Sequence, residues 1–259
     1  HKFTVKVDKR DLSGDYELGL FDEQVAPWEN DKSSHSFEGK AYVVVHVEKE
    51  GTLKECLQNT GADISSIRNL KITGKMTTED FEFIREEMGQ LEAINIKDVK
   101  VLNVKVDFDL KERFWDDDVL PTNAFKRMTG LRSIVLPDSI YGIGYGALRE
   151  LILKTPLILP DNITHIFDQA LGETDCDIEL PRRLEYIGRS AFSRSHCRGE
   201  LRLSETIKYI DEYAFRGAKG FRGTLSLPSG LEYLGENAFS QCGTALHGDI
   251  VIPTTLASL

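Results

Sequence analysis

Apolar residues recur in the second half of the chain with a period of about 23 residues. Each copy begins with an apolar–any–apolar triplet that is followed by Pro or, in one copy, by Ser. These anchor residues are Pro137, Pro160, Pro181, Ser204, Pro228 and Pro253. The steps between them are 23, 21, 23, 24 and 25 residues, and this regularity indicates an array of stacked repeats.

The apolar residues of each copy occupy the same columns when positions are counted from the anchor at position 0. Columns −3, −1, +3, +6, +10 and +11 are apolar, and column +10 is Ala in every copy that reaches it. This spacing fits neither a helical period of 3.6 residues nor a long alternation of period 2. We therefore expect each copy to form one coil of a solenoid. Its strand is expected at −3 to −1 and should end at the Pro, which lacks an N–H donor.

The residues before the array alternate between segments with strand patterns and segments with helix patterns. Strands are expected at residues 41–47, 69–73 and 91–96. Helices are expected at residues 53–58 and 77–90. Thr52 and Glu55 form a T-x-x-E capping-box signal before the first helix, and Gly74 is expected to end the second strand.

These patterns divide the chain into three parts. Residues 1–40 are irregular and polar apart from a possible strand at 3–7, and they form an N-terminal arm or linker. Residues 41–118 form helical N-terminal cap repeats that end in an acidic insertion. Residues 119–259 contain about six repeats, of which the last is incomplete.

The repeat resembles the BspA-like leucine-rich repeat found in surface proteins of Bacteroides and related bacteria. The pattern L-x-L-P-x-x-[IL]-x-x-[IL]-G-x-x-A-F is clearest at residues 178–192 (IELPRRLEYIGRSAF) and 225–239 (LSLPSGLEYLGENAF). The period also falls in the range of roughly 20–29 residues typical of leucine-rich repeats. Residues 51–96 are similar to the N-terminal cap of that group. The resemblance covers residues 40–259 and implies an α/β repeat fold, a leucine-rich-repeat solenoid with helix-containing N-terminal cap repeats.

Some copies depart from the pattern without weakening this expectation. Ser204 replaces the Pro, Phe167 and Asp211 replace the Gly, and Leu148 and Leu171 replace the Phe. The resemblance implies a secreted, surface-anchored and non-enzymatic binding protein, of a kind often linked to adhesion to host matrix proteins. It supplies no catalytic residues.

Charge and motif content narrow the function further. The 259 residues carry a formal net charge of −10, which argues against a nucleic-acid partner because such binders normally present a basic patch. No apolar run approaches the roughly 18 residues needed to cross a bilayer. The sequence contains no G-x-S-x-G, Walker or H-E-x-x-H motif, and its six His residues are scattered. We therefore expect neither an enzyme nor a cofactor.

Column +5 is the first candidate site, because it adjoins an inward-facing column and should point outward. It reads Gly142, His165, Tyr186, Tyr209, Tyr233 and Ser258. Tyr residues on successive coils would lie about one strand spacing, or ~4.8 Å, apart. The column is either a packed ladder of half-buried rings or a platform for a peptide or sugar, and His165, Tyr186, Tyr209 and Tyr233 are the candidate residues.

Column −2 is the second candidate surface. Glu179 and Arg202 lie on adjacent coils in this column and are expected to form an ion pair, which makes them further candidate binding residues. Val135 and Ile158 form an apolar patch nearer the cap, which the acidic insertion could cover or a partner could bind.

Cysteine and acidic residues offer two more possibilities. Cys176 and Cys197 should be neighbours on adjacent coils, as buried free thiols, as a disulfide, or as a metal site with His196. The acidic residues lie in or next to the insertion and are Asp107, Asp109, Asp116, Asp117 and Asp118. They form a solvated acidic loop or, alternatively, a calcium site.

Two functional hypotheses follow. The first is an extracellular binding module at the cell surface that recognises a host or matrix protein or a glycan through its repeat face. The second is a structural scaffold or spacer that self-associates edge to edge. The first residue is His1, so processing is expected, and any secretion signal would already have been removed. Because the last copy stops at Leu259, we expect the natural chain to continue or this end to pack against another copy.

Overall fold

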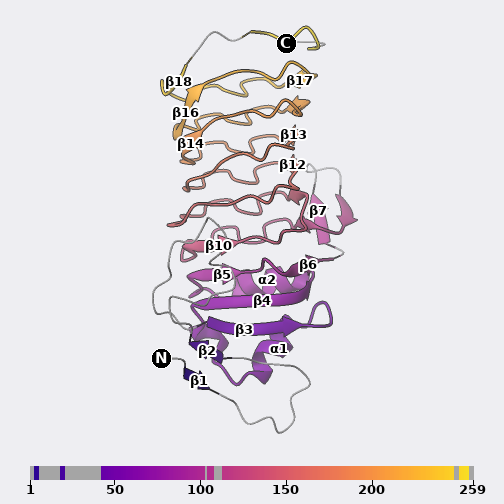
Figure 1. Cartoon of the computed structure of the whole chain (residues 1–259), viewed down its shortest axis with the longest axis vertical. Helices are drawn as coiled ribbons and strands as arrows, with labels where there is room; N and C mark the ends of the chain where they lie inside the picture. Colours follow the sequence, from indigo (N-terminus) through magenta and orange to yellow (C-terminus); the bar gives the residue numbers. More distant parts are fainter. Residues whose placement is uncertain are drawn as a thin grey trace.

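The chain forms a parallel β-solenoid of about eight turns over the part that the structure describes (Figure 1). The structure is a computed structural model that describes residues 3–5, 18–20, 42–102, 104–107, 113–247 and 251–256. The helices lie near the N-terminal end, and the coils follow one another toward the C-terminal end. Most of the predicted N-terminal arm, residues 1–40, lies outside the described residues.

The N-terminal cap is built on one mixed sheet. Its strands, in sheet order, are β1 (Phe3–Val5), β2 (Leu18–Leu20), β3 (Tyr42–Val47), β4 (Asn69–Met76), β5 (Ala93–Asn95) and β10 (Ser133–Val135), and β6 (Val99–Val101) also pairs with β4. Strands β3, β4, β5 and β10 are parallel, so the cap and the first full repeat share one sheet, as the sequence predicts. The expected end of β4 at Gly74 is wrong, because the strand continues past it and Gly74 pairs with Val47 and Val99.

Two helices cover this sheet, and both were expected from the sequence. They are α1 (Leu53–Asn59) and α2 (Thr78–Glu87), with a short 3-10 helix η1 (Ile64–Ser66) between them. Phe81, Ile84 and Met88 are buried on one face of α2, in agreement with their i, i+3, i+7 spacing.

The capping box expected at Thr52 and Glu55 does not form. The Thr52 hydroxyl donates to the Lys49 carbonyl instead (2.6 Å), and it makes no cap hydrogen bond. The buried Asp80 carboxylate takes over the role, since it accepts hydrogen bonds from the backbone N–H groups of Leu53 (3.0 Å), Gly51 (2.9 Å) and Thr77 (3.0 Å). One side chain therefore holds the N-terminal ends of both helices.

The repeats stack through a second, all-parallel sheet that runs along one side of the solenoid. Its strands, in sheet order, are β17 (Tyr233–Leu234), β15 (Tyr209–Ile210), β13 (Tyr186–Ile187), β12 (His165–Ile166), β11 (Gly142–Ile143) and β9 (Val119–Leu120). These strands occupy columns +5 and +6, so the expectation that the strand of each coil lies at −3 to −1 is wrong for most coils. Columns +5 and +7 keep their N–H groups, and these donate to the previous coil, for example from Tyr186 to Thr164 (3.1 Å) and from Gly188 to Ile166 (2.8 Å).

The other side of the solenoid carries shorter pairings. Strands β14 (Gly199–Glu200), β16 (Phe221–Thr224) and β18 (Leu246–His247) form a ladder there, and Leu157 and Ile178 make an isolated bridge. Figure 1 shows β14, β16 and β18 along the edge opposite to β12, β13 and β17. The insertion between the cap and the repeats is a hairpin of β7 (Val104–Asp107) and β8 (Arg113–Asp116), which projects beside the first coils.

The predicted apolar columns form the core. Column +10 holds a small residue at a completely buried position, because Ala147, Ala170, Ala191 and Ala214 have no exposed surface. Beside it in column +11, Phe192 stacks on Phe215 and Phe215 stacks on Phe239, with centroids 5.0 and 5.1 Å apart. Ile252 differs from the expectation, since it belongs to core column −1 but is 45% exposed.

Each coil turns two corners on residues with left-handed backbone conformation. In one coil these are Ser190 (φ 56°) and Arg194 (φ 54°), at columns +9 and +13. Between and at these corners the backbone N–H groups of Ser190, Phe192 and Arg194 donate to carbonyls of the next coil at 2.7–2.9 Å. This regular ladder offsets the cost of holding side-chain-bearing residues at positive φ.

Candidate functional site

The second, all-parallel sheet brings the tyrosines of column +5 together as the sequence predicts. Tyr186 pairs in register with Tyr209, Tyr209 with Tyr233, and His165 with Tyr186, all on parallel strands. We call Tyr186, Tyr209 and Tyr233 the Tyr column. Its last two residues are the more exposed ones, because His165 and Tyr186 are half-buried while Tyr209 is 43% and Tyr233 is 37% exposed.

The end of this column nearest the cap is closed by packing. The His165 ring stacks on Phe167 (5.7 Å) and Tyr186 (5.8 Å), and it meets Tyr141 edge-on (6.0 Å). Burial lowers the pKa of His165, an effect that the charge of Glu185 opposes. The packing interpretation therefore applies to this end of the column.

The hairpin β7–β8 contributes to the same closure. The Tyr141 hydroxyl donates a hydrogen bond to Asp116 of β8, and burial together with this bond raises the pKa of Tyr141. The hairpin thus covers the aromatic cluster from the side of the cap and leaves the other end of the column open.

The open end carries ordered polar groups. The Tyr209 hydroxyl donates to Glu232 Oε2 (3.0 Å), and Lys208 Nζ donates to Glu232 Oε1 (3.1 Å). The bond from Lys208, followed by the one from Tyr209, lowers the pKa of Glu232. The bond to Glu232 raises the pKa of Tyr209, so both groups keep their ordinary charges at neutral pH.

A carboxylate lies beside the Tyr column at Asp211, which directly follows strand β15. Asp211 Oδ2 accepts a long hydrogen bond from the Tyr186 hydroxyl (3.4 Å), and Oδ1 accepts one from the Glu212 backbone N–H (2.6 Å). Burial and the charges of Asp211 and Glu212 raise the pKa of Tyr233, while Arg189 opposes them. The open end of the column therefore has the carboxylates of Asp211 and Glu212 close to Tyr233.

Column −2 does not join this face. The expected ion pair between Glu179 and Arg202 is wrong, because Arg202 binds Glu200 instead (2.7 Å), two residues earlier on β14. Residues i and i+2 of an extended segment point to the same side, so Glu200 is the nearer partner. Glu179 is exposed, as is the apolar Ile158 of the same column at 54%. Glu179 directly follows Ile178 of the isolated bridge and Arg202 follows strand β14, so both belong to the other side of the solenoid from the Tyr column.

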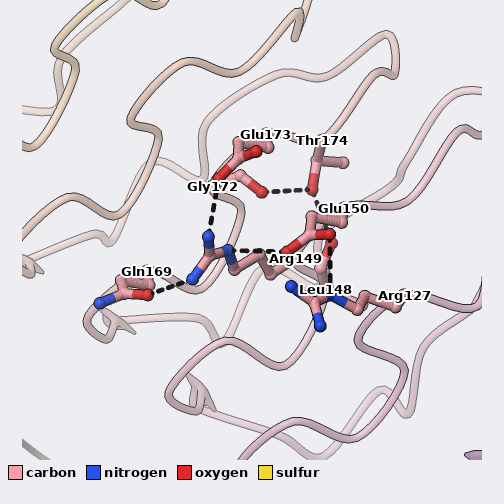
Figure 2. A network of polar contacts seen from close by, with 8 residues as sticks. All are labelled: Arg127, Leu148, Arg149, Glu150, Gln169, Gly172, Glu173 and Thr174. Carbon is pink, nitrogen blue, oxygen red and sulfur yellow. Dashed lines mark hydrogen bonds and ion pairs between the residues drawn. The ribbon is translucent and has the colours of Figure 1, made fainter.

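A network of charged side chains ties neighbouring coils together at the left-handed corner (Figure 2). Arg127 Nε binds Glu150 Oε2 (2.9 Å), and Arg149 binds Glu150 (3.3 Å), Glu173 (2.7 Å) and Gln169 (2.6 Å). The hydrogen bond from Arg127 lowers the pKa of Glu150. Since cations and carboxylates satisfy one another, we assign this network to coil stacking.

The buried cysteines adopt the first of the three arrangements considered. Cys176 and Cys197 are fully buried free thiols with their Sγ atoms 3.5 Å apart. His196 is exposed. Within the described residues, no group of three or more His, Cys, Asp or Glu side chains could hold a metal ion, so neither this pair nor the acidic insertion forms such a cluster there.

The acidic insertion is only partly described. Asp109 lies outside the described residues, while Asp116 and Asp118 accept hydrogen bonds from Tyr141 and Ser139, respectively. These two carboxylates are therefore engaged with the first coils.

Sequence reasoning missed three residues of the aromatic face: Tyr141, Phe167 and Asp211. Phe167 and Asp211 stand at column +7, where the motif has Gly, and Tyr141 stands at column +4. The signal was present, because columns +4 and +7 flank a strand at +5 and +6, but it became useful only once the strand was placed there.

The crystal structure of the pneumococcal vaccine antigen PcpA aligns with 84% of this chain at 15% identity and a TM-score of 0.34. The chain spans 58% of that structure. A search of curated proteins finds no significant match. Among the described residues, no helix is both long enough and apolar enough to cross a membrane.

The family comparison is decisive for the repeats. The model of the BspA type leucine rich repeat region matches residues 118–219 and 198–259, in six copies. Together these matches cover more than half of the chain and coincide with the coils that form the second, all-parallel sheet. The chain belongs to the family of BspA-type leucine-rich-repeat proteins.

Proposed function

We propose that the chain is a non-enzymatic binding module that is secreted or displayed at the cell surface and recognises a host or matrix protein or a glycan through the Tyr column. The family supports this proposal, because leucine-rich-repeat solenoids are typically non-catalytic and BspA-type proteins are often surface or secreted proteins. A repeat solenoid also offers an extended surface on which one residue type recurs at a fixed spacing.

One observation carries the proposal. Tyr209 and Tyr233 are exposed large aromatic side chains on adjacent strands, in register, on a rigid sheet. Aromatic residues with a polar tip are enriched at recognition surfaces, since the ring buries apolar area while the hydroxyl keeps a partner. The side of the column near the cap is packed, so recognition is assigned to the open end.

A binding screen tests the proposal. The wild-type chain and a Tyr186→Ala/Tyr209→Ala/Tyr233→Ala variant are applied to purified matrix proteins and to a glycan array, with folding checked by circular dichroism. An Ile158→Ser variant is the matched control, because it removes an exposed apolar side chain from the other side of the solenoid. We expect a ligand that the triple variant loses and the control retains. A ligand that binds all three chains equally would refute the assignment to this face.

A scaffold that self-associates edge to edge is the second candidate function. The observation that favours it is apolar exposure at Val251 (78%) and Ile252 (45%), in columns that belong to the strand-like triplet of the last described coil. Sedimentation velocity over a range of concentrations separates the candidates. Assembly that a Val251→Glu/Ile252→Glu variant abolishes and the triple Tyr variant retains would favour the scaffold.

A further inference from the structure

We propose that the open end of the Tyr column binds a lysine or arginine side chain of a protein partner, with Asp211 as the carboxylate that receives it. This inference rests on the proposed function, because it names the chemistry of the partner at the same face. We call Tyr186, Asp211 and Tyr233 the Asp211 site.

The position of Asp211 in the repeat sets it apart. At column +7 the other coils carry Gly144, Phe167, Gly188 and Gly235. A Cβ at Gly235 would lie 2.2 Å from the backbone N of Glu212, so Gly there is a packing requirement. Asp211 instead places a half-buried carboxylate directly beside the exposed rings.

The Asp211 carboxylate has unused capacity. Its described hydrogen bonds come from the Glu212 N–H and the Tyr186 hydroxyl, whereas a carboxylate offers about four acceptor positions. The nearby cations are already paired, because Lys208 binds Glu232 (3.1 Å) and Arg189 binds Glu212 (3.0 Å). Within the described residues Asp211 has no ion pair, so a cation from a partner would be its first.

The hydroxyl groups of Tyr186 and Tyr209 are held at opposite ends of the strands. The Tyr186 hydroxyl is tied to Asp211, after the strand of the next coil, and the Tyr209 hydroxyl is tied to Glu232, before the strand of the coil that follows it. In the proposed site the cation of the partner lies over Asp211, between Tyr186 and Tyr233, on the side away from the bond between Tyr209 and Glu232.

The spacing of the coils suits one cation. Core rings at Phe192, Phe215 and Phe239 show that coils repeat at 5.0–5.1 Å with nearly parallel ring planes. Tyr186 and Tyr233 are two coils apart, so their backbones are separated by about 10 Å. A cation between two rings needs to lie within about 6 Å of each centroid. At this spacing we expect a guanidinium or an ammonium group over Asp211 to contact both rings.

Charge and ring geometry favour a basic protein segment over a glycan. Glu185, Asp211 and Glu236 have no ion pair within the described residues, so the open end attracts cations. A six-membered ring that lies flat is wider than one coil repeat, so tyrosines on successive coils cannot all present their faces as a platform for stacked sugars. Carboxylates beside ring edges instead suit a side chain that enters end-on.

The test uses a fluorescein-labelled peptide of sequence GRGRGRG, with GQGQGQG as the uncharged probe, and measures fluorescence anisotropy at physiological salt. Asp211→Gly restores the motif residue and is expected to fold, and Asp211→Asn removes only the charge. Glu179→Gln is the matched control, because it removes one exposed and unpaired charge from the other side. We expect both Asp211 variants to weaken binding of the arginine peptide at least tenfold and the control to change it less than twofold.

The outcomes separate this inference from the proposed function. Equal effects of Asp211→Asn and Glu179→Gln, or equal binding of the two peptides, would show non-specific attraction or none and would overturn the inference. A matrix protein or glycan lost in the triple Tyr variant but bound normally by Asp211→Asn would also overturn it, while the proposed function would stand. Arginine-peptide binding at Asp211 combined with matrix binding that survives the triple Tyr variant would uphold the site and refute the proposed function.

Discussion

Phe192 and Phe215 lie face to face on adjacent coils, with centroids 5.0 Å apart and only 2° between the ring planes. The stack continues to Phe239 at 5.1 Å and 5°. The ring planes thus stay nearly parallel from coil to coil, and each coil is translated by about one strand spacing relative to the previous one. The same translation keeps the Tyr column in line on the strand side, so the core and the candidate site depend on one geometry.

Removal of a ring from the middle of this stack should therefore be costly. Phe215→Ala deletes a fully buried side chain that also meets Phe221 edge-on at 5.9 Å, and we expect unfolding free energy to fall by about 3–5 kcal/mol. Phe239→Ala, at a half-buried position of the same stack, should cost less. Urea unfolding followed by circular dichroism compares the two, and equal losses would contradict the stacked core.

The close approach of adjacent coils should make the stability of the chain sensitive to substitution of Gly235. A Cβ at Gly235 would lie 2.2 Å from Glu212 N and 2.4 Å from Asp211 C, both backbone atoms that cannot give way alone. We expect Gly235→Ala to lower stability by about 1–3 kcal/mol through overpacking. Gly230→Ala, five residues earlier, meets nothing within 4 Å and should change stability by no more than about 0.5 kcal/mol. Thermal unfolding of both variants measures the difference, and a tolerated Gly235→Ala would argue against this packing.

The cap depends on one buried carboxylate. Asp80→Ala leaves the N–H groups of Gly51, Leu53 and Thr77 without their acceptor, and we expect a loss of roughly 3 kcal/mol. Asp63→Ala is the control, because exposed Asp63 caps only η1 through Ser65 N (3.1 Å) and should cost about 1 kcal/mol or less. Chemical denaturation gives both values. Similar losses would mean that Asp80 does not join the two helices.

The buried thiols should be unreactive in the folded chain. The hydrogen bond with Cys197, together with burial, raises the pKa of Cys176, so that thiol stays protonated well above neutral pH. We expect a thiol-specific disulfide reagent at pH 8 to modify half-buried Cys56 first and to reach Cys176 and Cys197 only after unfolding. Mass spectrometry of tryptic peptides identifies the modified residues, and rapid native labelling of Cys176 would contradict its burial.

The raised pKa of Cys176 also makes the stability of the folded chain depend on pH. Below the ordinary thiol pKa of about 8.5 both the folded and the unfolded states hold the proton, and stability is unaffected. Above it the unfolded chain loses the proton while folded Cys176 keeps it, so stability falls by about 1.4 kcal/mol for each further pH unit. The stability of a Cys176→Ala variant should fall less steeply between pH 8.5 and 9.5, and parallel curves would refute the shift.

The sequence predicts the coil because each core column imposes one packing requirement, which one kind of residue meets. Column +10 is Ala because coils touch there, and column +3 is Ile or Leu because it fills the interior; Ala191 and Leu184 are both fully buried. The strands were misplaced because a short apolar–any–apolar triplet before a Pro looks like a strand. Backbone pairing, which decides where the strand lies, occurs at columns +5 and +6, and N–H groups at columns +5 and +7, such as those of Tyr186 and Gly188, donate to the previous coil.

The candidate site could also be predicted only in part. The repeat period places Tyr186, Tyr209 and Tyr233 on successive coils from the sequence alone, and the structure confirms that they are neighbours, on strands that the sequence did not predict. Side-chain partners could not be read from columns, because long side chains choose between several neighbours within reach. Arg202 takes Glu200 rather than Glu179, and the helix α1 takes its cap from Asp80, 27 residues after Leu53.

The central claim is that the open end of the Tyr column is the recognition surface. Hydroxyl-radical footprinting tests it most directly, by comparing oxidation of side chains in the free chain and in its complex with a matrix protein or glycan identified by the binding screen. We expect protection of Tyr209 and Tyr233, while Ile152 and Ile158, exposed at 40% and 54% elsewhere on the solenoid, stay as reactive as in the free chain. Protection of Ile152 and Ile158 with unchanged oxidation of Tyr209 and Tyr233 would contradict the account.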